Sequence, residues 1–190
     1  MITNDALIEE TRQKIFSAPD TISLERAILA TEAWQRFENE PPPLRRARTF
    51  DYILQNMSLD LETNPIFAGN TSPAPRAWML LPEYGFEVPA QAILENPHLK
   101  GFLDGEAIPM DIRSFWRDRS FGGEAGLGHL SIRNDYLLEK GLHYFIDRAN
   151  ALNINETNED ARVYRQACMI SCQAVIHWAE RYSDTARKAA

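Results

Sequence analysis

Apolar residues recur every three or four positions along the first third of the chain, which is the spacing of one helix face. They define three predicted amphipathic helices, at residues 5–16, 24–37 and 43–57. Pro19 ends the first, and Pro41–Pro43 separate the second from the third, because proline cannot donate the backbone hydrogen bond that a helix interior needs. Ser23 is the predicted N-cap of the second helix.

The last third shows the same periodicity. Residues 134–152 form one predicted helix, and we expect its apolar stripe to be buried: Tyr136, Leu137, Leu142, Phe145, Ile146 and Ala149. Thr157, with Asp160 three residues later, has the capping-box spacing and begins the last predicted helix. The stripe of that helix is Val163, Ala167, Ile170, Ala174, Trp178 and Tyr182. No glycine, asparagine or proline follows Tyr182 to end it.

The middle of the chain is irregular. Prolines and glycines interrupt residues 58–88 every few positions, and only Ile66–Ala68 and Ala77–Leu81 have the pattern of short strands. Short helices are predicted near 89–95 and 110–117. We therefore expect a mainly α fold, with residues 1–190 as a single region that contains an irregular loop section at 58–88 and a glycine-rich segment at 120–129.

Charge and composition narrow the function. The 190 residues carry a net charge of −7, and their one basic cluster is Arg45, Arg46 and Arg48, so nucleic-acid binding is disfavoured. The polar N-terminus does not resemble a signal segment, and no apolar run is long enough to cross a membrane. Two cysteines cannot form a disulfide scaffold. These features predict a cytoplasmic protein that binds neither nucleic acid nor membrane.

Two candidate sites are weak. Cys168 and Cys172 lie one helical turn apart, but a structural tetrahedral metal site needs four ligands, and His177 would lie about half a turn round the helix. We therefore predict no metal site and interpret both cysteines as small, buried, unreactive core residues. The glycines of residues 120–129 lack the Gly-Lys-Ser/Thr ending of a phosphate-binding loop.

His129 is the candidate binding residue. It follows the glycine-rich segment, where the backbone can approach a ligand closely, and it precedes a predicted helix. A neutral imidazole offers one donor and one acceptor to a polar ligand. His143 and His177 lie within predicted helices and are expected to be surface or partly packed residues.

Several short motifs occur together in an order typical of one family. They are Leu44–Ala47, Phe67–Asn70, Pro82-Glu83, Gly128-His129, Asp135-Tyr136, Lys140–Leu142, Met169–Ile176 and Ala179–Tyr182. With them, the chain resembles the N-terminal part of the glycyl radical enzymes, the pyruvate formate-lyase-like superfamily. It is most similar to the branch that contains glycerol and diol dehydratases, choline trimethylamine-lyase and hydroxyproline dehydratase.

The resemblance implies a specific chemistry for the parent protein. Such an enzyme is an α/β ten-stranded barrel in which a glycyl radical generates a thiyl radical on a cysteine, and the thiyl radical removes hydrogen from the substrate. An activating enzyme with S-adenosylmethionine and an iron–sulfur cluster installs the radical. The resemblance therefore implies anaerobic metabolism, with that activating enzyme, a small-molecule substrate and a homo-oligomer as partners.

This chain departs from the family pattern in its reactive residues. Its last glycine is Gly141, and neither Cys168 nor Cys172 matches the catalytic cysteine. We therefore expect no catalytic residue in this chain, no cofactor bound by it and no activity from it alone, and we expect the rest of the polypeptide as its partner. The resemblance assigns His129 and Phe121 to substrate binding, with His129 contacting a substrate hydroxyl and Phe121 forming an aromatic wall.

Three functional hypotheses stay open at this point. The first is the N-terminal portion of a dehydratase-type glycyl radical lyase, which eliminates water from a small polar metabolite such as a diol. Within the same family, the alternatives are a formate C-acetyltransferase and a C–N lyase. Outside it, the alternative is a stand-alone all-α binding or regulatory module without catalysis.

Overall fold

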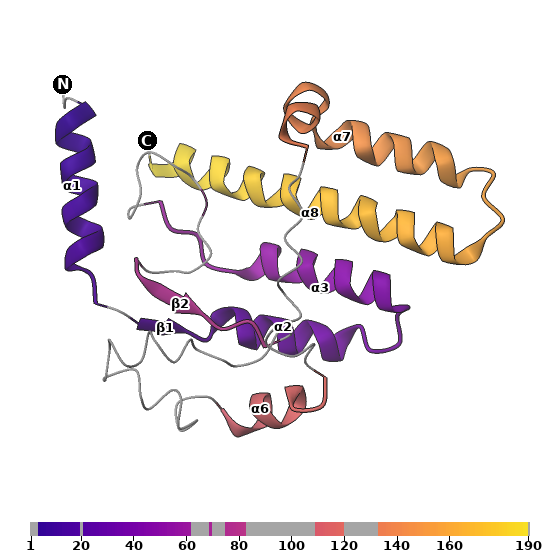
Figure 1. The fold of residues 1–190 in the computed structure, drawn as a ribbon, viewed down its shortest axis with the longest axis horizontal. Helices are drawn as coiled ribbons and strands as arrows, with labels where there is room; N and C mark the ends of the chain where they lie inside the picture. The colour runs from indigo at the N-terminus through magenta and orange to yellow at the C-terminus, as the bar shows by residue number, and fades with distance from the viewer. Residues whose placement is uncertain are drawn as a thin grey trace. The chain divides into compact units, whose positions relative to one another are not determined.

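The computed structural model describes residues 4–19, 21–61, 69, 75–82, 109–119 and 133–189. The described part is mainly helical (Figure 1), which confirms the predicted fold class. The chain divides into two compact units, one formed by residues 1–28 and 58–125 and the other by residues 29–57 and 126–190. The loop section 58–88 and the segment 120–129 lie mostly outside the described residues, so those boundaries stay predictions.

The first unit contains a short parallel strand pair. Strands β1 (Thr21–Ser23) and β2 (Ala77–Met79) pair with Thr21 opposite Ala77 and Ser23 opposite Met79. The position of β2 agrees with the strand predicted at Ala77–Leu81, whereas β1 was missed because three residues are too few to show an alternating pattern. The predicted strand Ile66–Ala68 lies outside the described residues.

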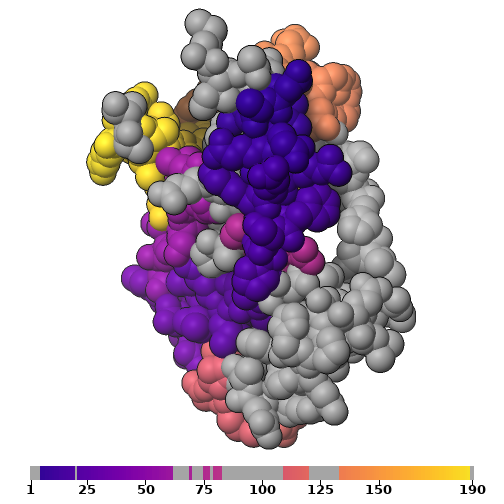
Figure 2. All heavy atoms as spheres, turned by 90° about the vertical axis from the view of Figure 1, so that its left-hand side faces the viewer, coloured from indigo at the N-terminus to yellow at the C-terminus, as the bar shows by residue number. Residues whose placement is uncertain are grey.

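The helices of the first unit differ in how deeply they are buried. Helix α1 (Asn4–Ser17), indigo in Figure 2, leaves large apolar side chains in solvent, since Ile8 and Phe16 are 54% and 70% exposed. Helix α6 (Met110–Trp116) instead buries Ile112 and Trp116. It confirms the short helix predicted near residues 110–117, whereas the helix predicted at 89–95 lies outside the described residues.

Helix α2 (Glu25–Arg36) begins in the first unit and continues into the second. The Ser23 hydroxyl accepts a hydrogen bond from the backbone N–H of Glu25 at 3.4 Å, so Ser23 lies at the start of α2, as predicted. At the other end, Arg45 of α3 (Pro42–Asn56) donates to the Trp34 carbonyl at 2.6 Å and stacks over the indole ring at 4.4 Å from its centre. This contact fixes the turn between α2 and α3.

The second unit is built around the long helix α8 (Glu159–Ala189), which lies between α3 (Pro42–Asn56) and α7 (Asn134–Asn153) (Figure 1). Helix α3 contacts α8 through a cluster of apolar residues: Leu44, Ala47, Val163, Ala167 and Ile170. Because alanines stand on both sides, the two backbones can approach closely. Along α8, Ala167, Ala174 and Tyr182 are buried, which confirms the stripe predicted for this helix.

Arg181 of α8 holds the C-terminal end of α3. Its guanidinium donates to the carbonyl oxygens of Leu54 and Met57, with a distance of 3.0 Å to Met57. The last carbonyl groups of a helix have no partner within that helix, so a guanidinium with several N–H groups is well suited to satisfy two of them. This contact joins segments that are 124 residues apart in the sequence.

Helix α7 differs from its prediction in two ways. Gly141 has φ of +72° and ψ of 169° and interrupts the helix, which the periodicity predicted to be continuous. None of its residues is fully buried, and the predicted buried stripe is only half-buried. The apolar periodicity of α7 predicted full burial of a stripe that is only half-buried. Half-buried and fully buried stripes have the same periodicity, so the sequence pattern does not separate them.

The turn between α7 and α8 is fixed by capping groups. The Asn158 side chain accepts a hydrogen bond from the Ala161 N–H at 3.1 Å, and the Glu156 carboxylate accepts from the N–H groups of Thr157 and Asn158. Asn158, not Thr157, therefore caps α8, and the predicted cap was wrong by one residue. Arg165 donates to Glu156 at 2.6 Å and ties the turn to the helix.

Candidate functional site

The two predicted substrate-binding residues, His129 and Phe121, lie outside the described residues. The same holds for the glycines between them. Their role in substrate binding therefore stays a prediction. The candidate site within the described residues is a groove on the second unit, which we call the α3–α8 groove.

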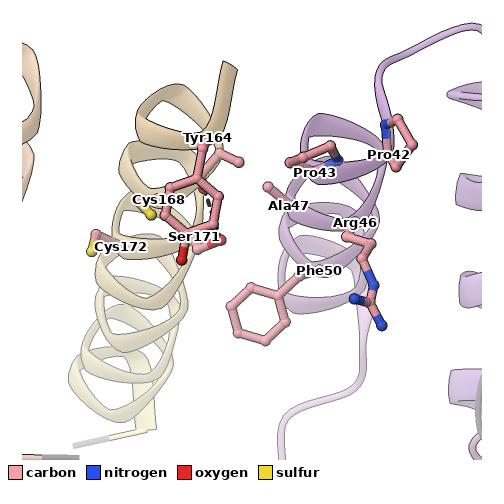
Figure 3. Close-up of a pocket in the computed structure, with 10 residues that line it drawn as sticks. Pro42, Pro43, Arg46, Ala47, Phe50, Tyr164, Cys168, Ser171 and Cys172 are labelled. Atoms are coloured by element: carbon pink, nitrogen blue, oxygen red, sulfur yellow. Dashed lines mark hydrogen bonds between the residues drawn. The ribbon is translucent and has the colours of Figure 1, made fainter. Parts of the chain in front are cut away.

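The α3–α8 groove has a volume of about 650 Å³ and runs between the two helices after which it is named (Figure 3). Its α3 side is formed by Pro42, Pro43 and Phe50 and its α8 side by Tyr164, Cys168 and Cys172, with further lining from Arg46, Ala47, Ala167 and Ser171. In Figure 3 the Phe50 ring extends from α3 into the space between the helices. Arg46 is the one charged residue in this lining.

A second hollow of about 640 Å³ continues the groove toward the beginning of α8. It shares Pro42, Pro43 and Tyr164 with the first and adds the acidic side chains of Glu159 and Asp160. The Tyr164 side chain, common to both hollows, is 64% exposed. The groove is therefore mostly apolar along its length and acidic at the end where α8 begins.

The residues of the groove were not found from the sequence, although a signal was present. On α8 the lining positions 164, 167, 168, 171 and 172 follow helical spacing. These positions lie next to the predicted core stripe and share Ala167 with it. The periodicity therefore does not distinguish them from the edge of that stripe. Small and weakly polar residues, such as cysteine and serine, conceal a second apolar face when only large apolar side chains are counted.

The structure corrects the interpretation of the cysteines. Cys168 is exposed and Cys172 is half-buried, so they are not buried core residues. Burial raises the pKa of the Cys172 thiol, with a smaller contribution from the neighbouring Cys168, which favours the neutral, unreactive form. No group of three or more histidine, cysteine, aspartate or glutamate side chains is placed to hold a metal ion in the part of the chain that the structure describes.

A pair of tyrosines forms a polar cluster on α7. The hydroxyl groups of Tyr136 and Tyr144 lie 3.0 Å apart, and their rings meet edge to face. This hydrogen bond raises the pKa of Tyr136 and lowers that of Tyr144, and the positive charge of Arg148 also favours the Tyr144 phenolate.

Two histidines can be placed. His143 is exposed on α7, and His177 is half-buried on α8, where its Nε2 lies 3.1 Å from the Gln173 amide nitrogen. Both positions agree with the prediction of surface or partly packed residues. His177 does not approach the two cysteines as a third ligand in a metal-binding group.

Comparison with known proteins identifies the family. Residues 4–190 match the family model described as pyruvate formate lyase-like. The chain belongs to this family. Membership confirms the resemblance seen in the motifs, since the match extends over nearly all of the chain.

The relatives are larger proteins. The (2S)-3-sulfopropanediol dehydratase of Klebsiella oxytoca is 25% identical over 96% of this chain and 27% of its own length. The isethionate sulfite-lyase of Nitratidesulfovibrio vulgaris is 23% identical over 89% of this chain and 26% of its own length. A structure from Roseburia inulinivorans, described for 1,2-propanediol dehydration, shares the fold with a TM-score of 0.77 at 20% identity and covers all of this chain and 28% of its own. The chain thus corresponds to the N-terminal part of such proteins and spans little more than a quarter of their length.

That this chain holds no catalytic residue stays a prediction. Gly141, the last glycine in the sequence, lies within α7, and both cysteines lie on the continuous helix α8. Among the described helices, none is both long enough and apolar enough to cross a membrane.

Proposed function

We propose that this chain is the N-terminal portion of a dehydratase-type glycyl radical lyase that eliminates water from a small polar metabolite such as a diol. The observation that carries the proposal is the family match over residues 4–190. The dehydratase relative from Klebsiella oxytoca, which aligns with 96% of the chain, supports the reaction type. The catalytic glycine and cysteine belong to the rest of the polypeptide in this proposal, so this chain alone is inactive.

The chain contributes substrate recognition and support. His129 contacts a substrate hydroxyl, because a neutral imidazole can both donate to and accept from hydroxyl groups. Phe121 forms an apolar wall beside it. The helices of the second unit support the surrounding polypeptide. An activating enzyme with S-adenosylmethionine and an iron–sulfur cluster supplies the radical to the complete protein.

Reconstitution tests the proposal. The chain is co-expressed with the polypeptide that completes the family length, and the complex is activated anaerobically with the activating enzyme. We expect a glycyl radical signal by electron paramagnetic resonance, together with aldehyde formation from a diol such as 1,2-propanediol. A radical signal without product from any diol would contradict the dehydratase assignment, and product from an amine or a sulfonate instead would indicate a different elimination.

His129→Ala tests the recognition role within that complex. We expect a fall in turnover of about a hundredfold or more, the size typical for loss of a group that binds or polarises the reacting part of a substrate. The radical content stays unchanged, since His129 does not take part in radical installation. His143→Ala, at an exposed histidine on α7, is the matched control and leaves turnover unchanged.

A second candidate is elimination of sulfite from a sulfonate. It is favoured by the sulfite-lyase relative, which aligns with 89% of the chain at an identity close to that of the dehydratase. The same reconstituted complex separates the two reactions, because isethionate releases sulfite in one case and a diol releases an aldehyde and water in the other.

A further inference from the structure

We propose that the α3–α8 groove is the docking site for an apolar helix of the polypeptide that completes the lyase. This inference rests on the proposed function and adds the surface through which the two parts join. The occupant is a helix of about four turns, because the lining runs from Asn158 to Cys172, or about 20 Å along α8.

The composition of the groove is that of an interface core. A quarter of the residues in the chain are charged, yet the ten residues that line the first hollow include one charged side chain, Arg46. Tyrosine, phenylalanine and arginine are the residue types enriched at the centres of protein interfaces, where they account for most of the binding energy. Tyr164, Phe50 and Arg46 supply all three types here.

The geometry suits a helix. Lining positions on both walls follow helical spacing, at 43, 46, 47 and 50 on α3 and at 164, 167, 168, 171 and 172 on α8. Two helices lying side by side present a furrow into which the ridge of a third can pack. A helix that fills such a furrow presents apolar residues at i, i+3, i+4 and i+7.

The length of the relatives identifies the occupant. The chain matches 27% of the length of the Klebsiella oxytoca relative and 28% of the Roseburia inulinivorans structure, so most of each protein lies outside the matched part. An exposed tyrosine in a groove of this size is the kind of surface that the remaining polypeptide would cover. Glu159 and Asp160 at one end predict that the docked helix has a lysine or arginine there.

The two cysteines provide the test, because they are the only cysteines in the chain and both line the groove. The chain is purified alone and in complex with the completing polypeptide, and iodoacetamide labelling of Cys168 and Cys172 is followed by mass spectrometry. We expect the labelling of exposed Cys168 to slow by about tenfold or more in the complex, since a docked helix excludes the reagent.

Substitution supplies the second arm. Tyr164→Glu places a charge in the groove and is expected to weaken the complex by about tenfold or more. The matched control is Gln166→Glu, which introduces the same charge at an exposed position of α8 that does not line the groove, and we expect it to leave affinity unchanged. Circular dichroism verifies that both variants keep the helical content of the chain.

Each remaining outcome overturns the inference in a distinguishable way. The complex could form and turn over substrate while Cys168 stays reactive and Tyr164→Glu binds normally. In that case the groove is not the docking site, and the proposed function stands. If the chain alone shows concentration-dependent protection of Cys168, a second copy occupies the groove. If no complex forms and no activity is restored, both the groove and the proposed function fail.

Discussion

Helices α3 and α7 lie on either side of α8, yet the two contacts are built differently (Figure 1). The α3 contact has buried residues, with alanines on both helices, and a guanidinium that holds the end of α3. Helix α7 itself has no fully buried residue, and the turn that joins it to α8 is held by Glu156 and Arg165. Similar sequence periodicities thus lead to one packed interface and one half-open interface.

The largest expected effect compares two isoleucines. Ile53 on α3 is 1% exposed, so Ile53→Ala leaves a cavity and is expected to lower the free energy of unfolding by about 3 kcal/mol. Ile146→Ala makes the same change on half-buried α7 and is expected to cost about 1 kcal/mol, because water can fill the space. Chemical denaturation of both variants measures the difference. Equal losses would mean that the two helices are packed alike.

Removing the guanidinium at the end of α3 has the next largest effect. Arg181→Met keeps the length of the side chain but leaves the Leu54 and Met57 carbonyls without their donor, so we expect a loss of about 2 kcal/mol. Arg187→Met is the control, because Arg187 pairs with Asp184 at an exposed position of the same helix. Hydrogen exchange of the last turn of α3 should accelerate in the first variant only.

The interruption of α7 predicts a smaller effect. Gly141 has φ of +72°, and an added Cβ would meet no atom within 4 Å, so Gly141→Ala introduces backbone strain without a steric clash. We expect a loss of about 1 kcal/mol, measured by thermal unfolding. Ala149→Gly makes the reverse change in the regular part of α7. It measures how much glycine destabilises an ordinary helical position of the same helix. A stabilised Gly141→Ala variant would indicate that α7 becomes a continuous helix when the glycine is removed.

The smallest effect is the pH dependence of the α7–α8 turn. The Asn158 N–H and then the Arg165 guanidinium hold the pKa of Glu156 below its ordinary value. A carboxylate with a lowered folded-state pKa stabilises the protein above its unfolded pKa, and this contribution is lost as pH falls through the folded pKa. Unfolding curves between pH 7 and about pH 3 should therefore lose less stability in Glu156→Gln than in the wild type. Equal pH dependence would show that this turn is not coupled to acid unfolding.

Much of the helical framework was predictable from the sequence, for identifiable reasons. Pro41–Pro43 and the regular apolar spacing located α3 to within a residue or two, and the stripe from Val163 to Tyr182 identified the packed side of α8. Both signals depend on local sequence, which is why they succeed. The motif order identified the family for a similar reason, because each motif is a short stretch of sequence.

The remaining features depend on contacts between distant residues. The β1 strand forms through pairing with residues more than fifty positions away, and its three residues have no pattern of their own. The exposure of Cys168 depends on where α3 meets α8, which the cysteine spacing does not encode. The groove was missed for the same reason, and the predicted site at Phe121 and His129 lies outside the described residues.

The bond from Arg181 to the end of α3 has a consequence for how the chain is made. Met57 leaves the ribosome 124 residues before the side chain that binds its carbonyl. At translation rates of about 5–20 residues per second, that interval is on the order of ten seconds. During this time the Leu54 and Met57 carbonyls lack this donor, so this part of the molecule reaches its final state only after Arg181 of α8 has emerged.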